Sequence, residues 1–115
     1  MKKYDLEDRC FEFARNVRLF LKEIGVSASN IEDGKQLIRS SGSVGANYIE
    51  ANESLGKKDF LMHIKISRKE AKESCYWLKL LDIKNEEQLE SKRRELIQET
   101  TELMNIFGAI LRKSE

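Results

Sequence analysis

Residues 36–81 decide the fold and read QLIRSSGSVGANYIEANESLGKKDFLMHIKISRKEAKESCYWLKLL. Apolar residues recur in this stretch every three or four positions, which is the spacing of amphipathic helices. A short polar segment at residues 53–57 separates two such patterns. The first pattern has small residues where a packed helix usually has large ones, and the second has two apolar stripes and one basic stripe. The stretch therefore predicts two long helices joined by a tight turn.

Helical periodicity continues on both sides of this stretch. It predicts helices over residues 5–24, 30–52, 57–82 and 85–113, with Asn30 and Asn85 as capping residues at two of the starts. Connections of only a few residues make helices that are consecutive in sequence antiparallel neighbours. The prediction is one all-α domain spanning residues 1–115, an up-down-up-down antiparallel four-helix bundle.

Composition agrees with this fold class. The 115 residues include no proline and are 40% hydrophobic, which suits one helical core and disfavours an all-β fold. No apolar run approaches the roughly 20 residues that span a bilayer, and the charged N-terminus lacks a signal-peptide pattern. We therefore expect a cytoplasmic protein without a membrane partner. The net charge of +1 excludes a uniformly basic protein but allows a local basic face.

The second predicted helix contains two interior glycines, Gly42 and Gly45. Each costs up to about 1 kcal/mol relative to alanine, so close approach of another helix is the expected compensation. A break or kink at residues 40–45 is the alternative. The predicted inward face consists of Ile31, Ile38, Ser41, Gly45, Ile49 and Asn52, flanked by Leu37, Val44, Tyr48 and Leu55.

The third predicted helix has two apolar faces. Its main face consists of Phe60, Ile64, Ser67, Ala71, Cys75 and Leu78, and the opposite stripe consists of Met62, Ile66, Trp77 and Leu80. A small monomer cannot bury both faces, so the stripe predicts an oligomer interface. The alternative is that residues 1–4 of the same chain cover it. Glu73 lies within the stripe and needs a partner there, for which a basic residue of a neighbouring subunit is one candidate.

A basic stripe lies between these two faces. It consists of Lys58, Lys65, Arg68, Lys69 and Lys72, and it predicts a nucleic-acid-binding surface, with a solvated helix face as the alternative. Tyr76 is the only aromatic residue within the stripe. We therefore expect binding to be directed to the phosphate backbone and sensitive to salt, without base stacking.

The sequence offers little for catalysis. His63 is the only histidine, and no Glu-x-x-His pair of the kind that binds metals in helical bundles is present. Cys10 and Cys75 fall at predicted core positions and are expected to be reduced, buried thiols. We predict no enzymatic activity, no catalytic residue, no metal and no cofactor.

Residues 36–81 resemble bacterial four-helix-bundle proteins encoded in 23S rRNA intervening sequences. The matching positions are Gln36, Leu37, Arg39, Ser43, Val44, Asn47, Glu50, Ala51, Lys57, Lys58, Phe60, Glu70, Glu73, Trp77 and Leu78. The resemblance implies a homopentamer. It also marks Arg39, Ser43, Asn47 and Glu50 as family-motif residues on one polar helix face, which forms either a binding or intersubunit surface or a solvated face with local pairs.

The related accessory variability determinants of diversity-generating retroelements imply a further role. They are basic pentamers that bind nucleic acid and a reverse transcriptase, whereas this chain is nearly neutral. The expected function is that of a non-enzymatic, oligomer-forming adaptor for RNA or DNA, such as rRNA or retroelement RNA, with a partner protein such as a reverse transcriptase. The alternative is a purely structural or protein-interaction oligomer that does not bind nucleic acid.

Overall fold

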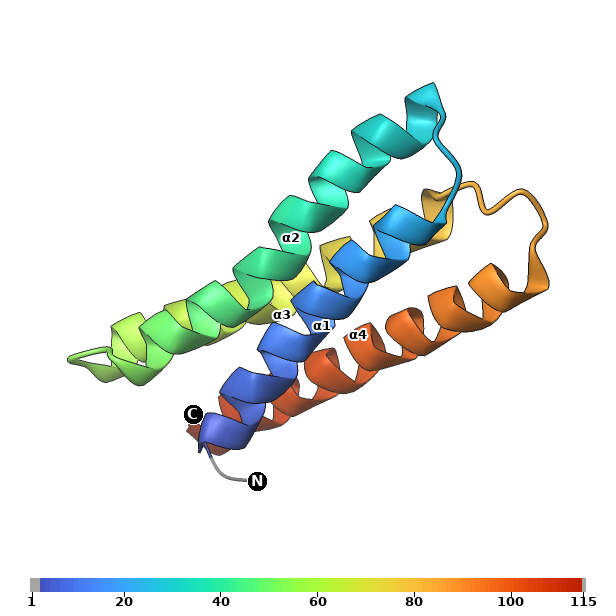
Figure 1. Cartoon of the computed structure of the whole chain (residues 1–115). Coiled ribbons are helices and arrows are strands. Elements are labelled where there is room, and N and C mark those ends of the chain that lie inside the picture. The colour runs from blue at the N-terminus through green and yellow to red at the C-terminus, as the bar shows by residue number, and fades with distance from the viewer. Residues whose placement is uncertain (1–2, 115) are drawn as a thin grey trace.

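Four long helices form an antiparallel bundle in the computed structural model, which describes residues 3–114 and the side chains of residues 5–114 (Figure 1). The helices are α1 (Lys3–Glu23), α2 (Ala28–Asn52), α3 (Lys57–Leu80) and α4 (Glu87–Ser114). Each helix packs against its two neighbours in the order α1, α2, α3, α4, and α1 closes the ring against α4. The predicted all-α, up-down-up-down bundle is confirmed.

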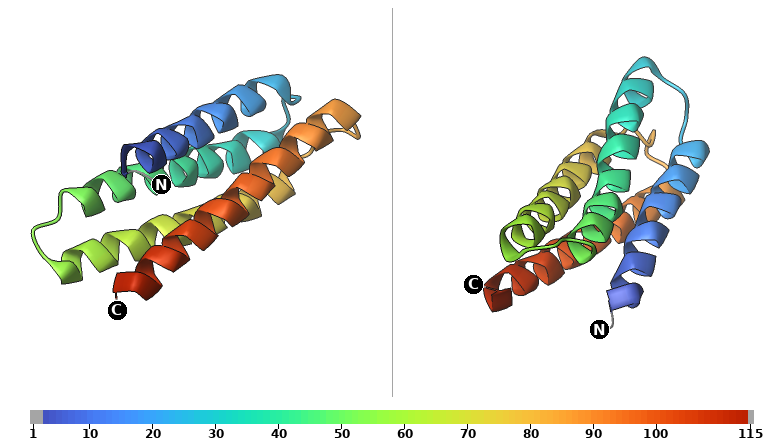
Figure 2. Two further views of the ribbon diagram at one scale, coloured as in Figure 1. Left: turned by 90° about the horizontal axis from the view of Figure 1, so that it is seen from below. Right: turned by 90° about the vertical axis from the view of Figure 1, so that its left-hand side faces the viewer.

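The bundle is elongated, with extents of 46 × 23 × 19 Å. One apolar stripe from each helix fills its centre. This core includes Leu6, Cys10, Phe13, Val17, Leu37, Val44, Ile64, Ala71, Leu78, Leu103 and Phe107, all at most 3% exposed. The two views in Figure 2 show α3 and α4 side by side, which is the pairing that positions the candidate site.

The glycine-containing helix α2 is continuous from Ala28 to Asn52, so a break at residues 40–45 is wrong, whereas a kink there, the other form of this alternative, stays a prediction. A Cβ atom placed at Gly45 would lie 3.1 Å from the Cβ of Cys10 on α1. This separation is tighter than ordinary van der Waals contact, so a larger residue at Gly45 would push α1 and α2 apart. The close helix approach predicted from the glycines is therefore confirmed at Gly45.

The inward face predicted for α2 is confirmed at Ser41, which is fully buried, but is wrong for its isoleucines and for the flanking Leu55, which is fully exposed. Ile31, Ile38 and Ile49 are 40–49% exposed, whereas Leu37, Val44 and Tyr48 are at most 5% exposed. Ser40, which was not placed on that face, is fully buried against α3. The helix therefore turns Ser40 inward and leaves the isoleucines at its edge.

Hydrogen-bonded serines join α2 to α3. The hydroxyls of Ser40 and Ser74 lie 2.8 Å apart, and the Ser67 hydroxyl donates to the Val44 carbonyl at 2.9 Å. All three serines are fully buried. Their small volume allows close contact between the helices, and their hydroxyls are satisfied, so burial carries little penalty.

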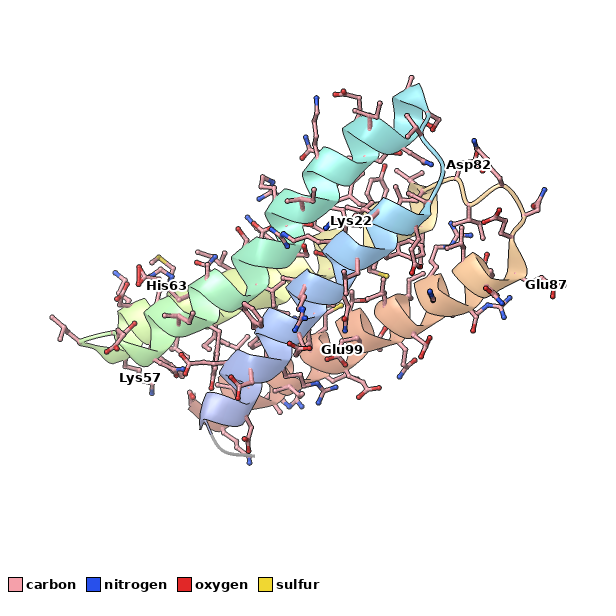
Figure 3. All side chains as sticks on the ribbon, viewed as in Figure 1. Lys22, Lys57, His63, Asp82, Glu87 and Glu99 are labelled. Carbon is pink, nitrogen blue, oxygen red and sulfur yellow. The ribbon has the colours of Figure 1, made fainter. Side chains whose placement is uncertain are left out.

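Asn30 and Asn85 do not cap their helices. The N-cap of α2 is Ser27, whose hydroxyl accepts from the Asn30 amide. The buried Asn30 side chain instead donates to the carbonyls of Gly25 and Asp82 and accepts from the Asp82 amide. It thereby ties together the two loops at one end of the bundle, where Asp82 is labelled in Figure 3. Asn85 has a positive φ of 62° in the loop before α4.

Candidate nucleic-acid interface

A groove between α3 and α4 gathers most of the predicted basic stripe. It has a volume of about 480 Å³ and is lined by Lys65, Arg68, Lys69, Lys72, Met104, Gly108, Leu111 and Arg112. Five of the eight lining residues are cations, and none is acidic. All five cationic side chains are exposed to solvent. Within the described part of the chain, none of them forms an ion pair with a carboxylate.

Arg112 is the site residue that the sequence analysis missed. It contributes the fifth cation of the groove from the last turn of α4, 32 positions after α3 ends at Leu80. Its guanidinium lies over the buried Gly108, one turn earlier, where a Cβ atom would come within 3.4 Å of Nη1. Only the α3–α4 pairing brings this residue beside Arg68 and Lys72, so the periodicity of α3 alone contained no signal for it.

Two of the three acidic residues of α3, Glu70 and Glu73, pair with α2 on the other side of the helix. Arg39 of α2 pairs with Glu70 at 3.2 Å and also contacts Glu73. The Arg39 guanidinium thus spans two carboxylates one turn apart on α3. Glu73, which the sequence analysis left in need of a partner, therefore finds one in its own chain. No carboxylate is among the described residues that line the α3–α4 groove, so its lining is positively charged despite a near-neutral chain.

The predicted cations divide between two grooves. Lys58 belongs to a second groove of about 840 Å³ along the first half of α3, with Lys57, Leu61, Met62 and Ile66 in its lining. Lys65 and Lys69 line both grooves. The second groove thus has an apolar floor edged by lysines and by Asp59, whereas the charged residues that line the α3–α4 groove are all cations.

The family-motif residues mainly connect α2 to α3. Besides the Arg39 ion pairs, the Asn47 side chain donates to the Ser43 carbonyl at 2.9 Å, and its Oδ1 lies 3.1 Å from Nδ1 of His63. The other ring nitrogen of His63 lies 3.5 Å from Asp59. Ser43 is half-buried, and Glu50 is exposed on the same helix. Two of the four motif residues therefore have intrachain partners on α3.

The predicted interface stripe is unevenly exposed. Met62 and Leu80 are 47% and 49% exposed, whereas Ile66 and Trp77 are half-buried. Trp77 packs against the core, and its indole nitrogen is buried with no hydrogen-bond partner among the described residues. The side chains of residues 1–4, which were the alternative cover for this stripe, lie outside the described residues. The described side chains leave Met62 and Leu80 open to solvent.

The cysteines and the possible metal ligands among the described residues do not form a reactive or metal-binding cluster. Burial raises the pKa of the Cys10 thiol to about 12, so the reactive thiolate is disfavoured at neutral pH. Cys75 is half-buried and is not in a disulfide. Over residues 5–114, no group of three or more His, Cys, Asp or Glu side chains is arranged to hold a metal ion. No helix in the described range is long and apolar enough to cross a membrane.

Comparisons with known proteins agree with this architecture. The sequence matches the family described as 23S rRNA-intervening sequence protein over residues 2–109. A crystal structure of a protein of unknown function from the S23 ribosomal protein family of Bacteroides thetaiotaomicron superposes with a TM-score of 0.77 at 31% identity. The match covers 97% of this chain and 99% of that one. A comparison with curated protein sequences finds no match. The chain therefore belongs to the 23S rRNA-intervening sequence protein family.

Proposed function

We propose that this protein is a non-enzymatic cytoplasmic adaptor that binds the phosphate backbone of nucleic acid through the α3–α4 groove. The observation that carries the proposal is the presence, in one groove, of five exposed cations that have no carboxylate partner among the described residues. Unpaired cations release condensed counterions when they neutralise phosphates, which favours binding. Arg68 and Arg112 can each engage two phosphate oxygens, while the three lysines act as point charges.

We take RNA as the ligand, with rRNA or retroelement RNA as the candidates implied by the family resemblance. A partner protein such as a reverse transcriptase stays a proposal from the resemblance alone. The groove itself is consistent with either RNA or DNA, because contacts with phosphates carry no direct sequence information.

A matched pair of triple variants tests the groove. Arg68→Ala/Lys72→Ala/Arg112→Ala removes three groove cations, and Lys22→Ala/Lys35→Ala/Arg94→Ala removes three exposed cations elsewhere. Titrations of structured RNA and duplex DNA at low and moderate salt should show that the groove variant binds about tenfold or more weakly than the control. Equal losses in both variants, or no binding by the wild-type protein at low salt, would contradict the proposal.

We further propose that the protein self-associates through the stripe of Met62, Ile66, Trp77 and Leu80, with a homopentamer as the form implied by the family resemblance. Support comes from the half-exposed Met62 and Leu80 and from the apolar groove that contains Met62 and Ile66. Methionine and aromatic residues are enriched at such contacts. If the protein is only a structural or protein-binding oligomer, the groove variant should assemble and bind its partner unchanged.

Light scattering tests the assembly. Met62→Asp/Leu80→Asp should reduce the particle mass to that of a monomer while helicity is retained, because both side chains are half-exposed. Trp77 is unsuitable for this test because it also packs against the core. Leu55→Asp at the fully exposed α2–α3 turn is the control and should leave the mass unchanged. An intact oligomer in the double variant would place the contact elsewhere.

A further inference from the structure

We infer that Tyr76 is a stacking platform for an unpaired base, so that the preferred ligand of the α3–α4 groove is single-stranded nucleic acid. This inference rests on the proposed binding of phosphates in that groove and specifies the ligand class. Tyr76 is 57% exposed although aromatic side chains are usually well buried, and it lies on the outer side of α3.

The ring of Tyr76 is held in place by its neighbour. Its centroid lies 5.0 Å from that of Trp77, with an interplanar angle of 76°, which is an edge-to-face contact. Trp77 is in turn packed against the core. The exposed ring therefore has a fixed support, which reduces the entropy that a base would lose on stacking against it.

Positive charge is arranged around this ring at helical spacing. Lys72 and Lys69 precede Tyr76 by four and seven positions, which places them one and two turns away on the same side of α3. Both lysines line the α3–α4 groove. The nearest acid on this stretch, Glu73, is engaged by Arg39. Tyr76 itself does not line the groove but lies one turn beyond Lys72 at its edge, so a strand whose phosphates contact Lys72 would have its next base directed toward the ring.

Stacking on a protein side chain requires an accessible base face. In a duplex both faces are occupied by neighbouring base pairs, whereas single strands, loops and bulges expose them. Aromatic stacking tolerates every base, so the inference predicts discrimination of strandedness rather than of sequence. No base stacking was predicted from the sequence, because the basic stripe contains a single aromatic residue. The sequence showed neither the exposure of Tyr76 nor its contact with Trp77.

The test compares one short mixed-sequence RNA as a single strand and annealed to its complement. Tyr76→Ala should weaken binding of the single strand by about fivefold to 150-fold and leave duplex binding within about twofold. Tyr76→Phe keeps the ring and should bind like the wild-type protein. Phe11→Ala removes another exposed aromatic residue, on α1 away from the groove, and should have no effect.

The only tryptophan of the chain provides a second readout. Because Trp77 contacts Tyr76, single-stranded RNA should change its fluorescence emission and the duplex should not. Unchanged single-strand affinity in Tyr76→Ala, together with weakened binding in the triple groove variant, would overturn the inference and leave the proposed function standing. Absence of wild-type binding to either RNA would overturn both. A changed particle mass in Tyr76→Ala would assign Tyr76 to a subunit contact and overturn the inference.

Discussion

The two sides of α3 use charge in opposite ways. Toward α2, Glu70 and Glu73 share one cation, Arg39, and the serines are hydrogen-bonded within the chain. Toward α4 and solvent, the cations of the groove have no carboxylate partner among the described residues. The inner side is thus satisfied by its own chain, whereas the outer side is available to an external anion.

This difference shows why net charge is a poor guide to the partner of a small protein. The chain has 21 basic and 20 acidic side chains, yet the fold pairs Glu70 and Glu73 of α3 with α2 and places no described carboxylate in the lining of the α3–α4 groove. A phosphate responds to the nearby charges rather than to their sum over the molecule. Predictions that alter one side of α3 at a time test this separation.

Overpacking the inner side should have the largest effect on stability. Ala71 is fully buried beside the serines of the α2–α3 contact, so Ala71→Leu should lower the free energy of unfolding by about 3 kcal/mol. The adjacent Lys72 is exposed, and Lys72→Ala should change it by less than about 0.5 kcal/mol. Urea denaturation measures both. Similar losses in the two variants would remove the distinction between the two sides.

Removing Arg39 should affect stability and binding together. Arg39→Met leaves the buried Glu70 without its partner, and we expect a loss of about 1–2 kcal/mol because Arg39 itself is half-exposed. The freed carboxylates of Glu70 and Glu73 should also weaken RNA binding by lowering the positive potential of α3. Urea denaturation and RNA titration measure the two effects.

The double variant Arg39→Met/Glu70→Gln is the control for this pair. It removes one uncompensated charge and should recover part of the lost stability and part of the affinity. Full retention of RNA binding in Arg39→Met alone would show that the inner carboxylates do not influence the outer side.

The α1–α4 contact gives a smaller effect that depends on pH. Arg9 donates to Glu99 at 2.7 and 2.8 Å and to Glu102 at 2.7 Å, and Glu99 is labelled in Figure 3 where α1 passes over α4. Hydrogen bonds from Gln98 and then Arg9 lower the pKa of Glu102 below its usual 4.5. A lowered folded-state pKa stabilises the protein above about pH 4.5, and this contribution is lost as the pH falls further.

Arg9→Met should therefore lower the free energy of unfolding at pH 7 and lower it by less near pH 3, as measured by urea denaturation at both values. The pH dependence should shrink without vanishing, because Gln98 still donates to Glu102. Arg15→Met is the control, since the Arg15–Glu12 pair is mostly exposed, and it should have little effect at either pH. A larger loss at pH 3 than at pH 7 would reverse the expected sign.

Helical spacing was sufficient to predict the number, order and antiparallel packing of the helices, but not the rotation of α2. Its isoleucines form one stripe and its leucine, valine and tyrosine another, and hydrophobicity alone favoured the isoleucines. The serines determined the outcome, because small hydroxyl-bearing residues allow close contact with α3 once their partners are present. Asn30 was likewise predicted to be a local helix cap. Its actual contact with Asp82 was not predictable, because it joins residues 52 positions apart.

The candidate site was predictable to the extent that it lies on one helix. The spacing of Lys65, Arg68, Lys69 and Lys72 was visible in the sequence, and the structure places all four along the α3–α4 groove. Arg112 was not predictable, since it reaches the groove only through helix pairing. The position of Lys58 in the second groove was not predictable either, because the sequence does not show where along α3 the α3–α4 groove begins.

The salt dependence of RNA binding tests the central claim most directly. If three or more groove cations contact phosphates of a single strand, log K should fall with log salt concentration with a slope of about −2 or steeper in the wild-type protein. The Arg68→Ala/Lys72→Ala/Arg112→Ala variant should give a slope that is shallower by about 2. Equal slopes for the two proteins would show that the α3–α4 groove does not hold the phosphates.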